Sequence, residues 1–278
     1  MLIFNDKFFS GLNFQWFKQF ISRSYLKIIK SLFLQQIVTM QNHYPQKAGI
    51  DYILKEAFGY WNRTLVYQIL FSLIYFSVLF LVLFYFANRF GIFEQYVALG
   101  DKLKEGVEAY QNGLKEIVAN PNFMKFQYVV LGTLSFLFPL NLGLFKMFRK
   151  LDLDEKLEME DLFAGYSGSN FFIYFGYFLF WFTVYSYFAP TLFLGVFWVL
   201  ITLFTAPLMF FMDKRILETF AINFKALRMF PLEILVGIFV AVAFKYFGIL
   251  TLIGAIFTFP FWNAMIYALY RKIFTEKN

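Results

Sequence analysis

Charged residues divide the chain into short polar segments and long uncharged stretches. Four stretches, 64–88, 126–145, 162–212 and 246–270, contain no Asp, Glu, Lys or Arg. A helix needs about 20 apolar residues to cross a hydrocarbon core of about 30 Å. The third stretch has room for two helices and is interrupted at Pro190, because proline lacks an N–H and favours a helix break or a first helical turn.

The uncharged stretches predict helices within 64–88, within 126–145, over about 170–188, over about 191–212 and within 246–270. A further helix is expected to begin near Pro231, although it carries Glu233 and Lys245 with only 11 residues between them. A full span and a re-entrant segment both fit this pattern. We favour the span, because Lys245 lies near its far end and can extend its ammonium group to the headgroups. The prediction is an all-α integral membrane protein with six transmembrane helices.

The composition supports this class. Hydrophobic residues make up 60% of the 278 residues, aromatic residues 24% and charged residues 15%. A soluble domain has roughly 45–50% apolar and about 25% charged residues. The chain has no Cys and a single His, His43. Thiolate chemistry, multi-histidine metal sites and most histidine-based catalysis are therefore excluded, and we expect no cofactor and no enzymatic activity.

The distribution of basic residues predicts the orientation. With six spans, 19 Lys and Arg residues lie on the side of the two termini and 6 on the other side. The richer side is cytoplasmic by the positive-inside rule, so the net charge of +7 indicates membrane orientation rather than nucleic-acid binding. Abundant Phe, Tyr and Lys without Cys are associated with AT-rich bacterial genomes. We expect a bacterial cytoplasmic (inner) membrane with both termini in the cytoplasm.

The same signals recur three times along the chain. An acidic-x-Phe motif precedes each helical pair, a proline lies near the middle of the second helix, and a short exit ends in basic residues. The acids are Glu56, Asp161 and Glu218, and the prolines are Pro139, Pro207 and Pro260. Chance coincidence in a Phe-rich chain is the alternative. We favour a true repeat of three parallel two-helix units, each with a proline-kinked second helix, related by an axis along the membrane normal.

One stretch carries a family resemblance. It comprises Ala206-Pro207-Leu208, Asp213, Leu217-Glu218-Thr219-Phe220, Phe224-Lys225-Ala226, Gly254, Thr258-Phe259-Pro260, Tyr267 and Tyr270-Arg271. This arrangement resembles the YciC-like proteins, which are similar to the membrane domain of some glycerophosphodiester phosphodiesterases. The resemblance covers about 50–273 and implies a six-helix bundle. It brings no phosphodiesterase activity, because the soluble catalytic domain is lacking, and the chain departs from the family at 1–49 and 90–125.

Three segments lie outside the predicted spans of the 50–273 membrane domain. Residues 1–49 fit a basic amphipathic helix on the cytoplasmic face, or an overlong start with Met40 as the true initiator. Residues 90–125 have apolar positions at spacings of three and four from Tyr96 to Ile117, which predicts an extracytoplasmic amphipathic helix. That helix could lie on the outer headgroups, cover the bundle or dock a partner. Residues 274–278 form a tail.

Few residues are candidates for a site. Asn141 and Asn263 follow Pro139 and Pro260, where their amides could bond freed carbonyls, bridge helices or bind a substrate. Glu233 is expected to favour a helix N-terminus near the interface, and His43 to be solvated. An acidic run could bind a divalent cation, but without EF-hand spacing we interpret it as a solvated linker. It comprises Asp152, Asp154, Glu155, Glu158, Glu160 and Asp161.

These features leave three classes of function. The preferred one is a non-enzymatic scaffold or accessory subunit of a membrane or envelope complex. Its partners would be the lipid bilayer and a protein bound through 90–125 or the N-terminal helix. The alternative is a transporter or channel for an apolar or lipid-like solute, which proline-broken helices suit but which lacks obvious coupling-ion sites. A membrane enzyme is the least favoured.

Overall fold

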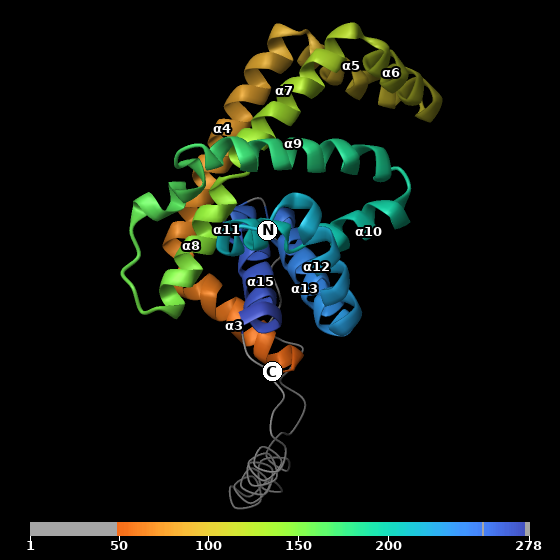
Figure 1. The fold of residues 1–278 in the computed structure, drawn as a ribbon. Helices are drawn as coiled ribbons and strands as arrows, with labels where there is room; N and C mark the ends of the chain where they lie inside the picture. Colours follow the sequence, from red (N-terminus) through yellow and green to blue (C-terminus); the bar gives the residue numbers. More distant parts are fainter. Residues whose placement is uncertain (1–48, 252, 276–278) are drawn as a thin grey trace, which may run out of the picture. The chain divides into compact units, whose positions relative to one another are not determined.

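The chain is described by a computed structural model for residues 49–251 and 253–275. The predicted N-terminal amphipathic helix, the Met40 alternative and His43 lie outside these residues, as does the end of the tail. Helices, joined by turns and short irregular segments, make up the described part, and no strand occurs in it (Figure 1).

The helices follow one another in this order: α3 (Ile50–Arg63), α4 (Leu65–Arg89), α5 (Ile92–Glu105), α6 (Val107–Ala119), α7 (Pro121–Leu137), α8 (Leu140–Asp152), η1 (Met159–Tyr166), α9 (Asn170–Phe188), α10 (Leu192–Thr202), α11 (Thr205–Met212), α12 (Ile216–Met229), α13 (Pro231–Leu250), α14 (Ile253–Thr258), α15 (Phe261–Tyr270) and the closing turn η2 (Arg271–Thr275).

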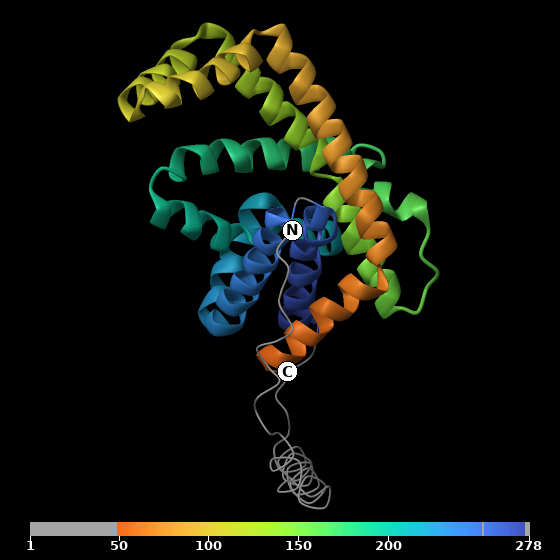
Figure 2. The same cartoon turned by 180° about the vertical axis from the view of Figure 1, so that it is seen from behind.

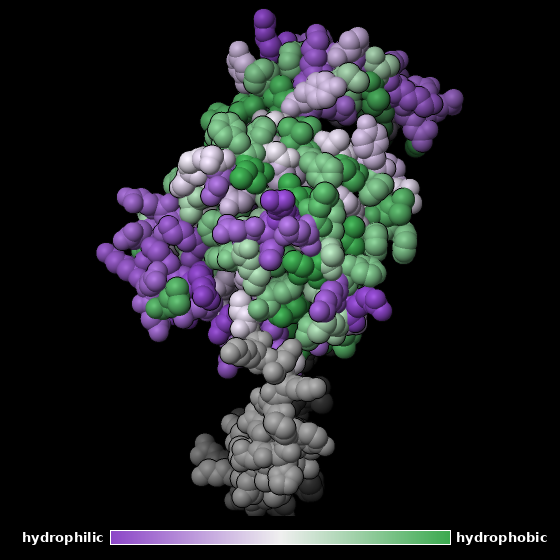
Figure 3. Space-filling view, viewed as in Figure 1, coloured by the Kyte–Doolittle hydropathy of each residue, from purple (hydrophilic) through white to green (hydrophobic). Residues whose placement is uncertain are grey.

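Within the described residues, six helices are long and apolar enough to cross a membrane. They are Leu65–Arg89, Pro121–Asp152, Asn170–Phe188, Leu192–Met212, Pro231–Leu250 and Ile253–Thr275. Figure 3 shows hydrophobic side chains over the middle of one face, with hydrophilic ones gathered over α5–α6 and over the segment between α8 and α9. This combination is that of a multi-pass membrane protein. α13 is 20 residues long, which is the length of a span rather than of a short re-entrant segment.

The second span is longer than its uncharged stretch. It begins at Pro121, whose missing N–H is not needed in a first turn, and the side chain of Asn120 accepts a hydrogen bond from the Asn122 N–H at 2.9 Å. It continues past Lys146 to Asp152. Charged side chains end an uncharged stretch without ending a helix, because their stems can lie along the helix while their charges reach water.

The helices are interrupted beside each of the three prolines. Pro139 lies between α7 and α8, Pro260 lies between α14 and α15, and α10 ends shortly before Pro207. A proline inside a helix removes one hydrogen bond and its ring crowds the carbonyl four residues earlier. The local sequence therefore accounts for each break.

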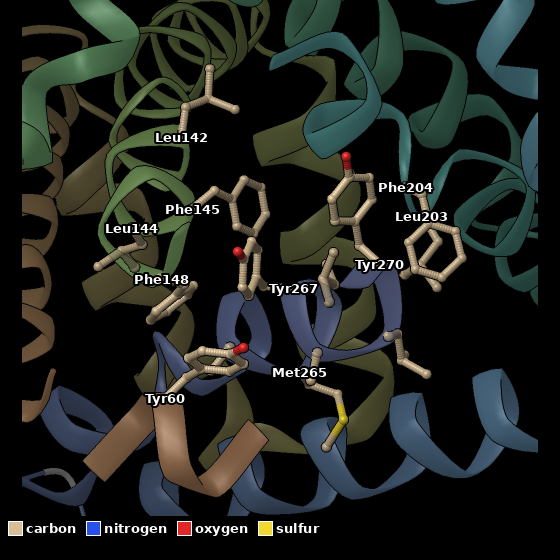
Figure 4. Close-up of a cluster of buried hydrophobic side chains, with 14 of the residues drawn as sticks. Tyr60, Leu142, Leu144, Phe145, Phe148, Leu203, Phe204, Met265, Tyr267 and Tyr270 are labelled. Carbon is tan, nitrogen blue, oxygen red and sulfur yellow. The ribbon is translucent and has the colours of Figure 1, made fainter. Parts of the chain in front are cut away.

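The core lies on the second helix of each pair. The buried share of the three second spans is 50, 50 and 61%, against 11, 11 and 22% for the three first spans. The halves after the prolines, α8, α11 and α15, contribute fully buried side chains such as Leu144, Leu208 and Leu269. Figure 4 shows Phe145 and Phe148 of α8 facing Tyr267 of α15. The first spans are left to contact lipid.

The segment 90–125 is two helices, so the prediction of one amphipathic helix is wrong. α5 and α6 are separated by Gly106, whose φ of +131° is in a region that side chains other than glycine rarely adopt. The two helices pack as a hairpin, with Leu99 and Ile117 buried and Lys102 Nζ 2.5 Å from Glu116 Oε2. Apolar spacing continued across Gly106, and only the backbone reversal separates the two helices.

Candidate functional site

A buried carboxylate joins three helices that are far apart in the sequence. Asp152 is the last residue of α8, and its carboxylate accepts a hydrogen bond from the Tyr60 hydroxyl of α3 at 2.5 Å. Its other oxygen accepts one from the Tyr267 hydroxyl of α15 at 2.7 Å. The two tyrosine rings meet edge to face at 5.1 Å, and Figure 4 shows both beside Phe148.

Arg271 completes this arrangement from the turn after α15. Its Nη1 lies 2.8 Å from Glu56 Oε2, 2.6 Å from the Tyr60 hydroxyl and 3.0 Å from Asp152 Oδ1. We call these five residues, Glu56, Tyr60, Asp152, Tyr267 and Arg271, the polar junction. Charge-assisted hydrogen bonds of this kind are roughly twice as strong as neutral ones. The polar junction therefore ties α3 to the ends of α8 and α15.

The electrostatics of the polar junction keep Tyr60 protonated. Burial raises the pKa of its hydroxyl, and the neighbouring Asp152 carboxylate raises the pKa further, while Arg271 lowers it less. A neutral Tyr60 can both donate to Asp152 and accept from Arg271. Both carboxylate oxygens of Asp152 are already engaged, so the geometry is suited to holding helices together.

A second carboxylate is buried where η1 packs on α8. Asp161 has a side chain only 3% exposed, and its oxygens lie 2.9 Å from Lys146 Nζ and 2.7 Å from Lys150 Nζ. The Glu158 N–H also donates to Asp161 at 2.9 Å, as part of a capping box at the start of η1. Burial alone would raise the pKa of Asp161, but these hydrogen bonds outweigh it and lower the pKa.

This lowered pKa predicts a pH dependence of stability. Because the folded pKa lies below the unfolded one, Asp161 stabilises the protein above the ordinary carboxyl range, and this contribution is lost as the pH falls through its folded pKa. Asp161→Asn should therefore lower the thermal unfolding midpoint in detergent at pH 7, by the equivalent of about 1–3 kcal/mol. It should also reduce the fall of that midpoint between pH 7 and pH 3.

The matched control is Glu160→Gln, which alters an exposed neighbouring carboxylate. An Asp161→Asn protein with the same pH profile as the unmodified chain would show that the Asp161 ion pairs contribute nothing to the pH dependence.

The two asparagines selected from the sequence lie in contact. Asn263 Nδ2 donates to Asn141 Oδ1 at 2.9 Å, which bridges α15 and α8. Asn141 Nδ2 donates to the Phe138 carbonyl at 2.8 Å, at the break beside Pro139. The amides therefore satisfy a carbonyl at the proline break and hydrogen-bond across helices, as polar groups in a membrane interior must.

The other sequence-selected residues are separate from one another. Pro139, Pro207 and Pro260 lie at three different helix breaks, and Glu233 is half-buried in the first turn of α13.

The interpretation of the acidic run as a solvated linker is wrong for its two ends. Asp152 and Asp161 are paired and largely buried, whereas the acidic residues between them are exposed. Burial depends on what α3, α15 and the lysines of α8 bring to these carboxylates. A count of charges along the chain cannot reveal such long-range partners. A signal was present, however, in the basic residues that close each repeat exit, because Lys150 and Arg271 both lie 11 residues after a repeat proline.

No model of a known protein family matches the chain, and neither does any curated protein or solved structure. The fold and the polar junction define the class, a helical multi-pass membrane protein whose ends of spans are joined by ion pairs. The resemblance to the YciC-like proteins stays a prediction.

Proposed function

We propose that the protein is a non-enzymatic scaffold or accessory subunit of a complex in a bacterial cytoplasmic membrane. The observation that carries this proposal is the use of buried charge for holding helices together. Arg271 and Glu56 are 215 residues apart in the chain, yet they pair at 2.8 Å. Such contacts give a closed framework, which suits a protein that positions others.

The three-unit repeat supports the same proposal. The inner half of each unit packs on the leading helix of the next: Gly143 of α8 on Leu162 of η1, and Thr205 of α11 on Thr219 of α12. Phe261 of α15 then packs on α3, with its ring 4.7 Å from that of Phe58. The third unit thus returns to the first, and we infer a cyclic order of the three units.

Ion pairs repeat this cyclic relation at two of the three junctions. Lys150 and Arg271 each lie 11 residues after a repeat proline, and each pairs with the acid of an acidic-x-Phe motif, Asp161 and Glu56. α9 runs at a steep angle to α4 in both views (Figures 1 and 2). The proposed equivalence therefore concerns the inner halves and leading helices rather than the first spans.

A transporter of an apolar or lipid-like solute is the second candidate. It is favoured by an open apolar hollow along α4, toward the end that joins the hairpin. Its lining is Ser77, Phe80, Leu81, Leu83, Phe84 and Ala87 of α4, together with Phe126 of α7. An acyl chain or another apolar solute fits this lining.

One purification separates the two candidates. The chain is cross-linked in native membranes, extracted in mild detergent and compared with the chain reconstituted alone into vesicles. A scaffold should retain one protein at fixed stoichiometry and should not accelerate movement of a fluorescent lipid analogue between leaflets. A lone chain that moves the analogue faster than protein-free vesicles do would favour the transporter.

The 19-to-6 imbalance of Lys and Arg predicts the topology. A reporter fused after residue 278 should be active only in the cytoplasm, and a tag inserted at Gln111-Asn112-Gly113, in α6, should be labelled by a reagent that does not cross the membrane. An external C-terminal reporter would show that α13 does not cross, and the third unit of the repeat would then be lost.

A further inference from the structure

The hairpin α5–α6 is attached to the membrane spans at both ends. Only Phe90 and Gly91 separate α4 from α5, and only Asn120 separates α6 from α7. The hairpin turns aside from the line of α4 and α7 in both views (Figures 1 and 2). Because linkers of one or two residues span a few ångströms, both helices must start at the boundary of the hydrocarbon region.

The contact between α5 and α6 uses only part of the apolar arc of α5. Leu99 is buried in this contact, where it packs against Gly113 of α6. At 100° per residue, the apolar side chains beside Leu99 form one continuous arc, and the acidic residues of α5 lie on the opposite side. The exposed members of the arc are Phe93, Tyr96, Val97 and Leu103, which are 42, 48, 59 and 57% exposed.

The position and the chemistry of this arc identify what covers it. An unpartnered apolar face at the end of two spans meets the headgroup region first. An amphipathic helix can bury such a face about 5–10 Å into that boundary, and aromatic residues are enriched there. Phe93 and Tyr96 lie in the first turns of α5, closest to the spans.

The charge of the hairpin excludes attraction to anionic lipid as the cause. Residues 92–119 contain three lysines and five acidic residues. A basic surface would be drawn to anionic headgroups, but a slightly acidic one is not. The association must then come from apolar burial alone.

We propose that the Phe93, Tyr96, Val97 and Leu103 face of α5 lies in the headgroup region of the extracytoplasmic leaflet and binds lipid through apolar contact. The hairpin then lies along the membrane surface and carries its acidic side toward water. This inference does not depend on the scaffold role, because it concerns the bilayer alone.

The absence of cysteine from the sequence permits a direct test. Single nitroxide labels are placed on the apolar arc with Val97→Cys and Leu103→Cys, and on the opposite side with Glu94→Cys and Glu105→Cys. Each labelled chain is reconstituted into phosphatidylcholine vesicles with and without phosphatidylglycerol. Collision with oxygen, which concentrates in lipid, is compared with collision with a water-soluble nickel chelate.

The ratio of oxygen to nickel collision should be several-fold higher at 97 and 103 than at 94 and 105, with the same values in both lipid mixtures. Equal ratios at all four positions would place the arc in water and overturn the proposal. A difference that appears only with phosphatidylglycerol would replace apolar contact by electrostatic attraction. Labels at 97 and 103 shielded from both reagents in native membranes would identify a protein as the occupant instead.

Discussion

Replacing Gly143 with alanine is expected to separate η1 from α8. A Cβ atom at residue 143 would overlap the carbonyl oxygen of Leu162 and lie 2.6 Å from the Leu162 Cα. Both partners are backbone, so no side-chain rotation can relieve the overlap. Overpacking of this kind costs about 3 kcal/mol when the backbone must move. We expect a thermal unfolding midpoint in detergent lowered by several degrees, and faster proteolysis between α8 and α9.

The same displacement should weaken the Asp161 ion pairs, because Lys146 and Lys150 lie on the helix that carries Gly143. The matched control is Gly132→Ala in the same span, where an added Cβ meets nothing within 4 Å. That change should leave the midpoint unchanged or slightly raised, since alanine favours helix over glycine. Equal midpoints for the two variants would contradict the close packing of α8 and η1.

Removing the carboxylate of Asp152 should have an effect of similar size. Asp152→Ala leaves the Tyr60 and Tyr267 hydroxyls without their acceptor, and it leaves Arg271 with one carboxylate fewer. Loss of one member of a largely buried charged network costs about 3 kcal/mol. Because the network joins α3 to α8 and α15, we also expect α3 to become accessible to protease before the spans unfold.

A double-mutant cycle tests whether the polar junction acts as a unit. Asp152→Ala and Arg271→Met, measured singly and together, should be non-additive, because the two side chains share Tyr60 and lie 3.0 Å apart. Asp154→Ala, at an exposed neighbouring carboxylate, is the control and should change the midpoint little. Additive effects of the two junction variants would mean that the contacts contribute independently.

The spans could be predicted from the sequence because a membrane imposes a local rule. Every backbone group in hydrocarbon must be paired within its own helix, so a span needs about 20 apolar residues regardless of its neighbours. The expected helices over about 170–188 and about 191–212 correspond to α9 and to α10 with α11. The helix breaks beside the prolines also follow from local chemistry, since each proline lacks its own N–H.

Two features depend on the folded backbone or on neighbours brought close by folding. The apolar spacing of 90–125 continues through Gly106, but its φ of +131° divides the segment into two helices. Asp152 and Asp161 belong to one acidic run, and nothing in that run distinguishes them from the exposed acids between them. They are buried because α3, α8 and α15 bring tyrosine, lysine and arginine side chains to them, the most distant being 115 and 119 residues away in the sequence.

The sequence by itself thus determined the class of the protein, its six apolar spans and the places where they break. Those properties depend on interactions within a few residues and on the bilayer, which is the same for every helix. The tertiary structure decided which carboxylates are buried, how the hairpin folds and how the third unit returns to α3. Those properties depend on contacts such as that of Arg271 with Glu56, between residues with no local relation along the chain.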